Sequence, residues 1–129
     1  YGAGLSLMAL AKDARIKTAV ALSGWATMAD ELYARSTGNV TWGTILSLGT
    51  VVGRPAPEVN QYMQALMNPD TPAAKIAEIT AWSKVRSPST YVDAINARNA
   101  PVFLSKNFQD DLFTPNSSLA MFAALDLAT

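Results

Sequence analysis

Two adjacent carboxylates near the end of the chain are the residues best suited to polar chemistry. Residues 101–105 form a short apolar run typical of a buried strand, and Asp110 and Asp111 follow it. In open α/β sheets, functional groups gather at the carboxyl ends of the strands. A carboxylate there can orient a histidine base and stabilise its charge. Asp110 and Asp111 are therefore candidates for a functional site.

The partners that such an acid needs are not evident in the sequence. The 129 residues include no histidine and no cysteine, which excludes an imidazole base, a thiol nucleophile and the usual zinc sites. Ser6 follows a glycine by two positions, as in a nucleophile elbow, but Met8 stands where the second glycine is required, so we expect a helix residue. Ser23 and Ser105 lie in or beside predicted strands, and we expect structural roles for both. No metal or cofactor is expected.

The composition points to a globular domain with no charged partner. Half of the residues are hydrophobic, and ten basic residues balance ten acidic ones. Such a chain has no electrostatic footprint for nucleic acid or for an anionic membrane. Because no apolar segment is long enough to cross a bilayer, we expect neither nucleic acid nor membrane as a partner.

Two strands separated by a long helical stretch make up the predicted architecture. Residues 16–23 and 101–105 are short apolar runs that suit strands buried on both faces of a parallel sheet. Helices are predicted over residues 5–11, 26–33, 40–52, 58–67, 72–84 and 88–95, and after Pro115. The first of these helices is apolar almost all round, which suits a buried helix. Since two strands alone make a poor sheet, the pattern resembles the second half of a larger α/β domain.

The motifs at both ends of the chain resemble one family. Tyr1-Gly2-Ala3-Gly4, an apolar helix and then Ala19-Val20-Ala21-Leu22-Ser23-Gly24-Trp25 are similar to the α/β-hydrolases related to X-prolyl dipeptidyl peptidases and cocaine esterase. The elbow of that family reads Gly-x-Ser-Tyr-Gly-x-Gly, so Gly2 matches its second glycine, where a side chain would clash. Ser87-Pro88, Asp93-Ala94-Ile95 and Gln109-Asp110-Asp111-Leu112-Phe113 resemble the return from the helical cap of the family and its acid loop.

The resemblance implies a partial α/β-hydrolase fold, with two parallel strands flanked by helices and a helical cap insertion. Residues 1–34 and 100–129 would belong to the hydrolase core, and residues 35–99 to the cap and its return. The implied activity is that of a serine hydrolase that cleaves an ester or amide by acyl transfer. The serine would directly precede Tyr1 and the histidine would follow Thr129, so the chain alone is expected to be inactive. The expected partners are a small-molecule or peptide acyl substrate and the rest of the hydrolase domain or another chain.

The resemblance also assigns roles to particular residues. The backbone N–H of Tyr1 would donate to the oxyanion of the intermediate. Asp110 is the preferred acid because Leu112-Phe113 then aligns with the Leu-Phe pair of the family, whereas the spacing to Pro115 favours Asp111. A third interpretation is a solvated turn in which one aspartate caps the following helix.

The aromatic residues leave a second function open. Two roles are open for them: lining an acyl pocket or packing the helices against each other. Packing is the more usual role, and it is expected of Trp25, Trp42, Trp82, Tyr62 and Tyr91. Core filling is expected of Met8, Met28, Met63, Met67 and Met121. The alternative to a hydrolase is a non-catalytic helical module that binds a partner through its aromatic residues. Adjacent parallel strands would support the hydrolase, whereas an all-helical chain would exclude it.

Overall fold

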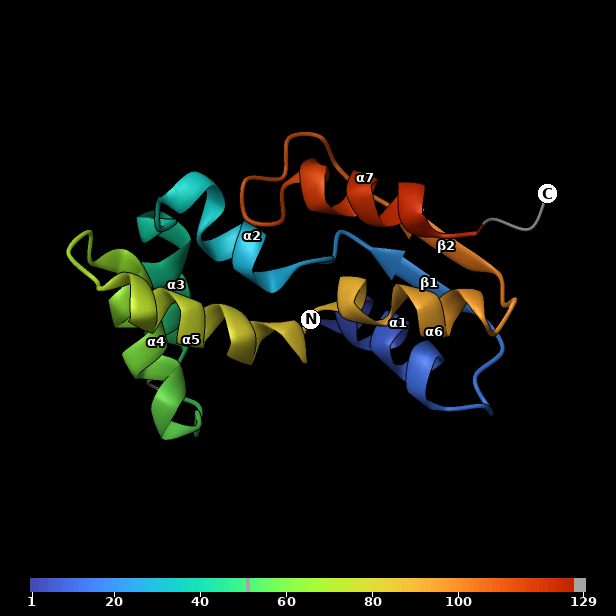
Figure 1. Ribbon diagram of the computed structural model, residues 1–129, viewed down its shortest axis with the longest axis horizontal. Helices are drawn as coiled ribbons and strands as arrows, with labels where there is room; N and C mark the ends of the chain where they lie inside the picture. Colours follow the sequence, from blue (N-terminus) through green and yellow to red (C-terminus); the bar gives the residue numbers. More distant parts are fainter. Residues whose placement is uncertain (51, 127–129) are drawn as a thin grey trace.

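A two-stranded parallel sheet lies in one half of the molecule (Figure 1). The computed structural model describes residues 1–50 and 52–126. Strand β1 (Ala19–Leu22) pairs with β2 (Val102–Ser105), with Ala19 opposite Val102 and Leu22 opposite Ser105. The predicted parallel pairing is therefore confirmed, and the all-helical alternative is excluded.

Both strands are shorter than the sequence predicts. The expected strand over residues 16–23 begins only at Ala19 and ends before Ser23, whose φ of 50° turns the backbone into the left-handed region. The expected strand over residues 101–105 loses Pro101, which has no N–H to donate. The carbonyl of Pro101 still accepts the Ala19 N–H at 3.2 Å, so this residue aligns the start of the pair.

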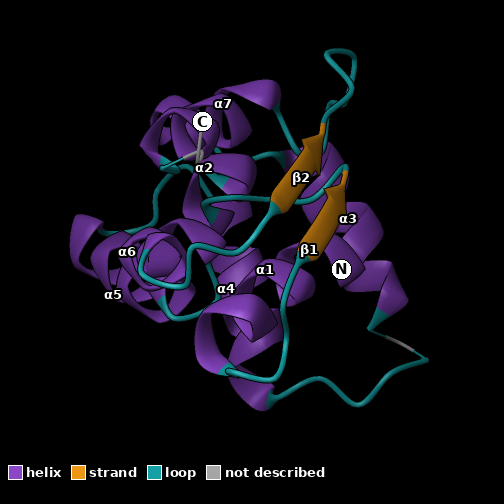
Figure 2. Ribbon diagram, turned by 90° about the vertical axis from the view of Figure 1, so that its right-hand side faces the viewer, coloured by secondary structure: helices purple, strands orange, loops and turns teal. Residues whose placement is uncertain are grey.

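Helices cover only one face of the sheet (Figure 2). Ala19 and Ala21 are buried against helices α1 (Gly2–Lys12), α6 (Val92–Asn96) and α7 (Pro115–Ala124). The alternate residues Val20 and Leu22 are 57% and 59% exposed, and Phe103 on β2 is 58% exposed. The prediction of strands buried on both faces is wrong for these residues, because no element of the described chain lies over the second face.

Helix α1 is half-buried, which differs from the buried helix that its composition predicts. Leu7 and Leu10 lie in the core, whereas Leu5 is 55% exposed. The reason is the same as for the strands: the helix has one neighbouring layer in the described structure. Arg98 holds its carboxyl end, because the guanidinium donates to the carbonyls of Leu10, Asp13, Ala14 and Ile16 at 2.8–3.1 Å.

Helices α2 to α5 form the other half of the molecule, called here the helical half (Figure 1). It comprises α2 (Met28–Leu32), the short 3-10 helix η1 (Ala34–Ser36), α3 (Val40–Gly49), α4 (Pro57–Met67) and α5 (Ala73–Lys84). The Asn39 side chain caps α3 by accepting the Trp42 N–H at 3.2 Å. Helix α3 ends at Gly49, short of the predicted residue 52, and residues 51 and 127–129 of the predicted elements lie outside the described residues.

A 3-10 helix links the helical half to the sheet. The helix predicted over residues 88–95 is divided into η2 (Pro88–Tyr91) and α6. Ser87, which precedes η2, is buried, and its hydroxyl accepts the Met28 N–H at 2.9 Å and donates to the Ser83 carbonyl. This one side chain therefore fixes the start of α2 against the end of α5.

Candidate functional site

Asp110 lies in a turn at the carboxyl end of β2. One carboxylate oxygen accepts the backbone N–H groups of Leu112 and Phe113, at 3.2 and 2.8 Å. The other accepts Lys106 Nζ at 3.1 Å. The Asp110 side chain is 17% exposed and that of Lys106 11%. Asp110 is therefore a fixed and largely enclosed carboxylate rather than part of a solvated turn.

The surroundings of Asp110 favour its ionised form. Burial by itself raises the pKa of this carboxyl, but the hydrogen bond from the Phe113 N–H, the Lys106 ammonium and the Leu112 N–H together outweigh burial and lower the pKa. A carboxylate has about four acceptor positions, and these three donors leave room for one more. The group is thus charged near neutral pH and able to accept a further N–H.

Asp111 is placed differently. Its residue is exposed, and its backbone carbonyl accepts the Asn39 amide at 3.4 Å. The segment after Asp110 is bent and not extended. The structure thus separates an enclosed aspartate from an exposed one, which the sequence alone leaves as alternatives.

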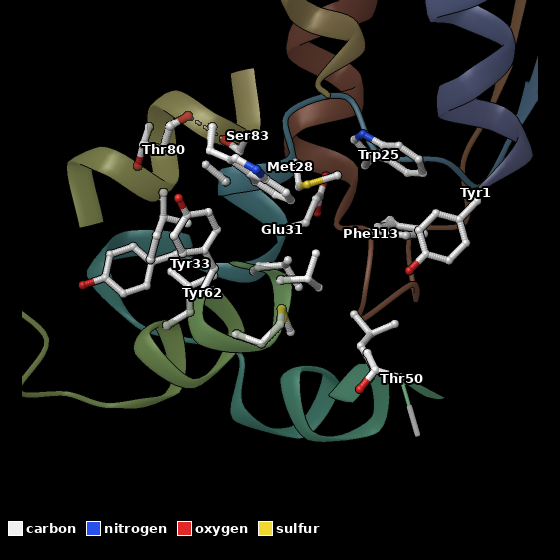
Figure 3. A pocket seen from close by; sticks show the side chains of 18 residues that line it. Tyr1, Trp25, Met28, Glu31, Tyr33, Thr50, Tyr62, Thr80, Ser83 and Phe113 are labelled. Atoms are coloured by element: carbon white, nitrogen blue, oxygen red, sulfur yellow. Dashed lines mark hydrogen bonds between the residues drawn. The ribbon is translucent and has the colours of Figure 1, made fainter. Parts of the chain in front are cut away.

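An aromatic cluster brings Tyr1 next to the acid loop. The rings of Tyr1 and Trp25 meet edge-on with centroids 5.7 Å apart, and the Phe113 ring also lies 5.7 Å from Trp25 (Figure 3). Lys106 Nζ is 5.4 Å from the centre of the Phe113 ring. Tyr1 immediately precedes α1, and its carbonyl accepts the Leu5 N–H. Tyr1 and Asp110 therefore lie at the same edge of the sheet, although they are 109 positions apart in the sequence.

Gly4 and Gly24, rather than Gly2, are the glycines beside Trp25 at which an added side chain would clash with the described residues. A Cβ added at Gly4 would lie 2.7 Å from the Trp25 ring, whereas one at Gly2 would meet no atom within 4 Å. The clash expected at Gly2 involves the strand that precedes the elbow of the family, so it stays a prediction. The close approach of α1 to Trp25 is the reason for the clash at Gly4.

Substituting alanine at Gly4 is expected to destabilise the fold by about 1–3 kcal/mol, because the new methyl group overpacks the Trp25 ring. Gly2→Ala is the matched control: it adds the same methyl group in open space at the start of the same helix, and alanine favours the helix by up to about 1 kcal/mol. Urea unfolding followed by Trp fluorescence measures both. Equal effects of the two changes would contradict this account of the Gly4–Trp25 contact.

Glu31 is a buried carboxylate that the sequence analysis did not single out. It is only 2% exposed, and it accepts the Thr114 N–H at 2.7 Å, the Thr114 hydroxyl at 3.2 Å and the Ser117 hydroxyl. Glu31 lies on α2 and therefore caps the first turn of α7. Burial raises its pKa despite these donors and the nearby Lys106. An acidic residue within a short amphipathic helix gives no sequence signal of such a role.

A cavity of about 290 Å³ lies between the aromatic cluster and the helical half. Its wall is almost wholly apolar and comes from both halves of the molecule (Figure 3). The lining residues include Trp25, Glu31, Val59, Tyr62, Thr80 and Trp82. Since Tyr1 and Phe113 also border it, the cavity opens beside the acid loop.

Three of the five aromatic residues singled out from the sequence line this cavity. Trp25, Tyr62 and Trp82 do so, and packing alone therefore does not describe them, whereas Trp42 and Tyr91 lie outside the wall. Trp25 is also buried at 4% exposure, and its indole N–H donates to the Arg86 carbonyl at 2.8 Å. Among the methionines, Met63 and Met121 are buried, and the other three are partly exposed.

The serines have the structural surroundings that the sequence predicts. Ser6 lies within α1 and donates to the Ala3 carbonyl at 2.8 Å, Ser23 follows β1, and Ser105 ends β2. Among residues 1–50 and 52–126, no three acidic side chains gather as a metal site would require. Within the same part of the chain, no helix combines the length and the apolar character needed to cross a bilayer.

The strands, the one-sided helical layer and the acidic loop at the carboxyl edge define a partial α/β fold of the kind found in hydrolases. A family model described as X-Pro dipeptidyl-peptidase (S15 family) matches residues 1–128. The chain therefore belongs to the X-Pro dipeptidyl-peptidase (S15) family, and the resemblance seen in the sequence is confirmed. A search of curated proteins returned no match to the chain.

Proposed function

We propose that these residues form the acid loop and the substrate cavity of a serine hydrolase that cleaves an ester or amide by acyl transfer. The main support for this proposal is the enclosed Asp110 carboxylate at the carboxyl end of β2, next to an apolar cavity. Family membership supports a hydrolase of the peptidase type. Asp110 would accept the Nδ1–H of a histidine and stabilise the imidazolium that forms during the reaction.

The remaining groups of the reaction would come from outside these residues, because the sequence contains no histidine. Tyr1 would donate its backbone N–H to the oxyanion if a serine precedes it, since its nitrogen would then be an amide. Ester or amide cleavage would proceed through attack of the serine on the carbonyl and transfer of its proton by the histidine. No part of this scheme requires a cofactor.

We also propose a partner for the open sheet face and strand edges. Val20, Leu22 and Phe103 expose apolar side chains side by side on paired strands. In the proposed hydrolase, the rest of the domain or another chain would cover this face and pair with the outer edges of β1 and β2. None of these three side chains lines the cavity.

The activity of two polypeptides tests the proposal. The 129-residue chain alone is expected to turn over no p-nitrophenyl ester and to react with no fluorophosphonate probe, because it has no imidazole to activate a serine. A longer polypeptide that includes these residues and their flanking sequence is expected to do both. Stoichiometric labelling of Ser6, Ser23 or another serine of the short chain would contradict the proposal, as would a longer polypeptide that is folded but unreactive.

A further inference from the structure

Lys106, the first residue after β2, has an ammonium group that is enclosed and held in place. Its side chain is 11% exposed. The ammonium donates to the Asp110 carboxylate at 3.1 Å and to the Gly24 carbonyl at 3.4 Å, and it lies 5.4 Å from the centre of the Phe113 ring. An enclosed charge requires such partners, whereas most lysines keep their ammonium in water. Lys106 is therefore a fixed cation beside the proposed acid.

The bond to Gly24 connects the acid loop with the neighbouring strand. Gly24 follows β1, and it packs so closely against the start of α1 that an added Cβ would lie 2.5 Å from the Ala3 Cβ. Tyr1, whose N–H is the proposed oxyanion donor, immediately precedes α1. Through Gly24, Lys106 therefore links the side of the site that carries the acid to the side that carries the oxyanion donor.

The acid loop, residues 106–114, is held at both of its ends. At its first residue, the Lys106 ammonium bonds to the end of β1. At its last residue, the Thr114 N–H donates to Glu31 on α2 at 2.7 Å. Asp110 lies between these two anchors and bonds to Lys106 directly. Removing the ammonium would therefore release one end of the loop and one bond of the acid at the same time.

The bonds of Asp110 determine where a histidine can bind. Oδ1 accepts the backbone N–H groups of Leu112 and Phe113, and these two donors fill its two acceptor positions. Oδ2 accepts Lys106 and has one position left. A histidine Nδ1–H that bonds to Asp110 without breaking the turn therefore binds Oδ2, beside the Lys106 ammonium.

Two carboxylates face the Lys106 ammonium, namely Asp110 on its own loop and Glu31 on α2. Burial raises the pKa of each carboxyl, and the positive charge of Lys106 acts against burial in both. In the described part of the chain, the groups that β1 and α7 place beside Lys106 are uncharged. An imidazolium bonded to Asp110 would be a second cation at this place, and a neighbouring like charge lowers the pKa of an imidazole.

We propose that Lys106 is a positioning residue of the hydrolase, which holds the acid loop against the end of β1 and presents Oδ2 of Asp110 to the histidine. This inference rests on the proposed function, because it takes Asp110 to be the triad acid. Lys106 acts through Asp110 and not on the substrate. Its loss should therefore lower the rate of acyl transfer and leave substrate affinity nearly unchanged.

NMR of the 129-residue chain tests the contact without any catalysis. The ammonium protons of Lys106 should exchange with water at least about tenfold more slowly than those of the exposed Lys17, because they are bonded and enclosed. Lys106→Met identifies the signal. Asp110→Ala, which removes the carboxylate, should speed the exchange, whereas Asp111→Ala should not. A Lys106 ammonium that exchanges as fast as that of Lys17 would overturn the inference.

Kinetics of a polypeptide that contains the complete hydrolase domain test the role in the reaction. Lys106→Met removes the ammonium and keeps an unbranched apolar stem, and kcat should fall about 10- to 100-fold because the acid loses its fixed position. Lys17→Met is the matched control. It makes the same change at an exposed lysine that donates to the Ala14 carbonyl at 3.0 Å, and it should leave kcat unchanged. If Lys106→Met does not fold, Lys106→Gln replaces it.

The pH dependence of kcat/KM separates positioning of the triad from a merely structural role. Loss of the Lys106 charge favours the imidazolium, so the acid limb of the profile should move to higher pH. The loss of kcat/KM in Lys106→Met should then be at least about threefold greater on the acid limb than on the plateau. Lys106→Arg keeps the charge and should return the limb to the position that it has in the parent.

Two kinetic outcomes would overturn the inference while the parent polypeptide is active. One is a kcat of Lys106→Met within about twofold of the parent. The other is an acid limb that does not move, which would show that the histidine displaces the lysine or that Lys106 serves the fold alone. A longer polypeptide that is folded but unreactive would instead overturn the proposed function, and with it any role of Lys106 in a triad.

Discussion

Replacing Asp110 with asparagine, in a polypeptide that contains the complete hydrolase domain, is expected to lower the rate of acyl transfer by about 10⁴-fold. Asparagine keeps the shape of the side chain but removes the charge that stabilises the imidazolium in the transition state. The loss should therefore appear in kcat, with little change in KM. Steady-state hydrolysis of a p-nitrophenyl ester measures both constants.

Asp111→Asn is the matched control for this experiment. It removes the same charge one position further along, from an exposed residue whose carbonyl, not its carboxylate, is bonded in the structure. Its effect on the rate should be far smaller. A hydrolase disabled by the change at Asp111 but nearly normal with asparagine at position 110 would show that the acid is Asp111. If neither substitution affects the rate, the proposed triad is wrong.

Lys106 affects how the Asp110 result is interpreted. Its ammonium is 3.1 Å from the carboxylate oxygen that has an acceptor position to spare. A histidine Nδ1–H would share that oxygen with Lys106 or displace it. While Lys106 is bonded there, it favours the ionised carboxylate, because its hydrogen bond and charge lower the pKa of Asp110. Circular dichroism of Asp110→Asn must accompany the kinetics, since this substitution also alters bonds that hold the turn.

The local features of the sequence were sufficient to predict the strand pair and the turn with two aspartates that follows its second strand. Residues 19–22 and 102–105 are short, apolar and rich in β-branched or small residues, which is the signature of a buried parallel strand. That signature does not depend on which neighbours are present. The degree of burial does, and so the exposure of Val20 and Leu22 on one face could not be predicted from the run itself.

The contacts that assemble the site could not be predicted, because they join residues far apart in sequence. Glu31 contacts Ser117 across 86 positions, and Arg98 contacts Leu10 across 88. No local pattern identifies such partners. The different surroundings of Asp110 and Asp111 also could not be predicted, because they depend on the turn that places the Asp110 carboxylate against Lys106. The same holds for Gly4, whose role appears only when Trp25 packs against α1.

Glu31→Ala is expected to destabilise the fold by roughly 3–5 kcal/mol, because it leaves the Thr114 N–H and the Ser117 hydroxyl buried without an acceptor. Glu31→Gln keeps an acceptor for Thr114, and the Ser117 hydroxyl can rotate to accept from the new amide. Its cost should therefore be smaller, about 1 kcal/mol. Urea unfolding at one pH measures both free energies, and similar losses for the two variants would contradict a role in hydrogen bonding.

The pH dependence of the free energy of unfolding, compared between the parent chain and Glu31→Gln, isolates the effect of the Glu31 carboxyl group. Because burial raises the pKa of Glu31 above its ordinary value of 4.5, the folded state binds this proton more tightly than the unfolded state. The contribution of Glu31 to stability is therefore fully present below about pH 4.5 and is lost as the pH rises through the folded pKa. The free energy of unfolding of the parent chain, minus that of Glu31→Gln, should fall over this interval. Asp110, whose pKa is lowered, has the opposite dependence, but it is present in both proteins and cancels in the difference. A difference that is constant, or that grows with pH, would show that burial does not raise the pKa of Glu31.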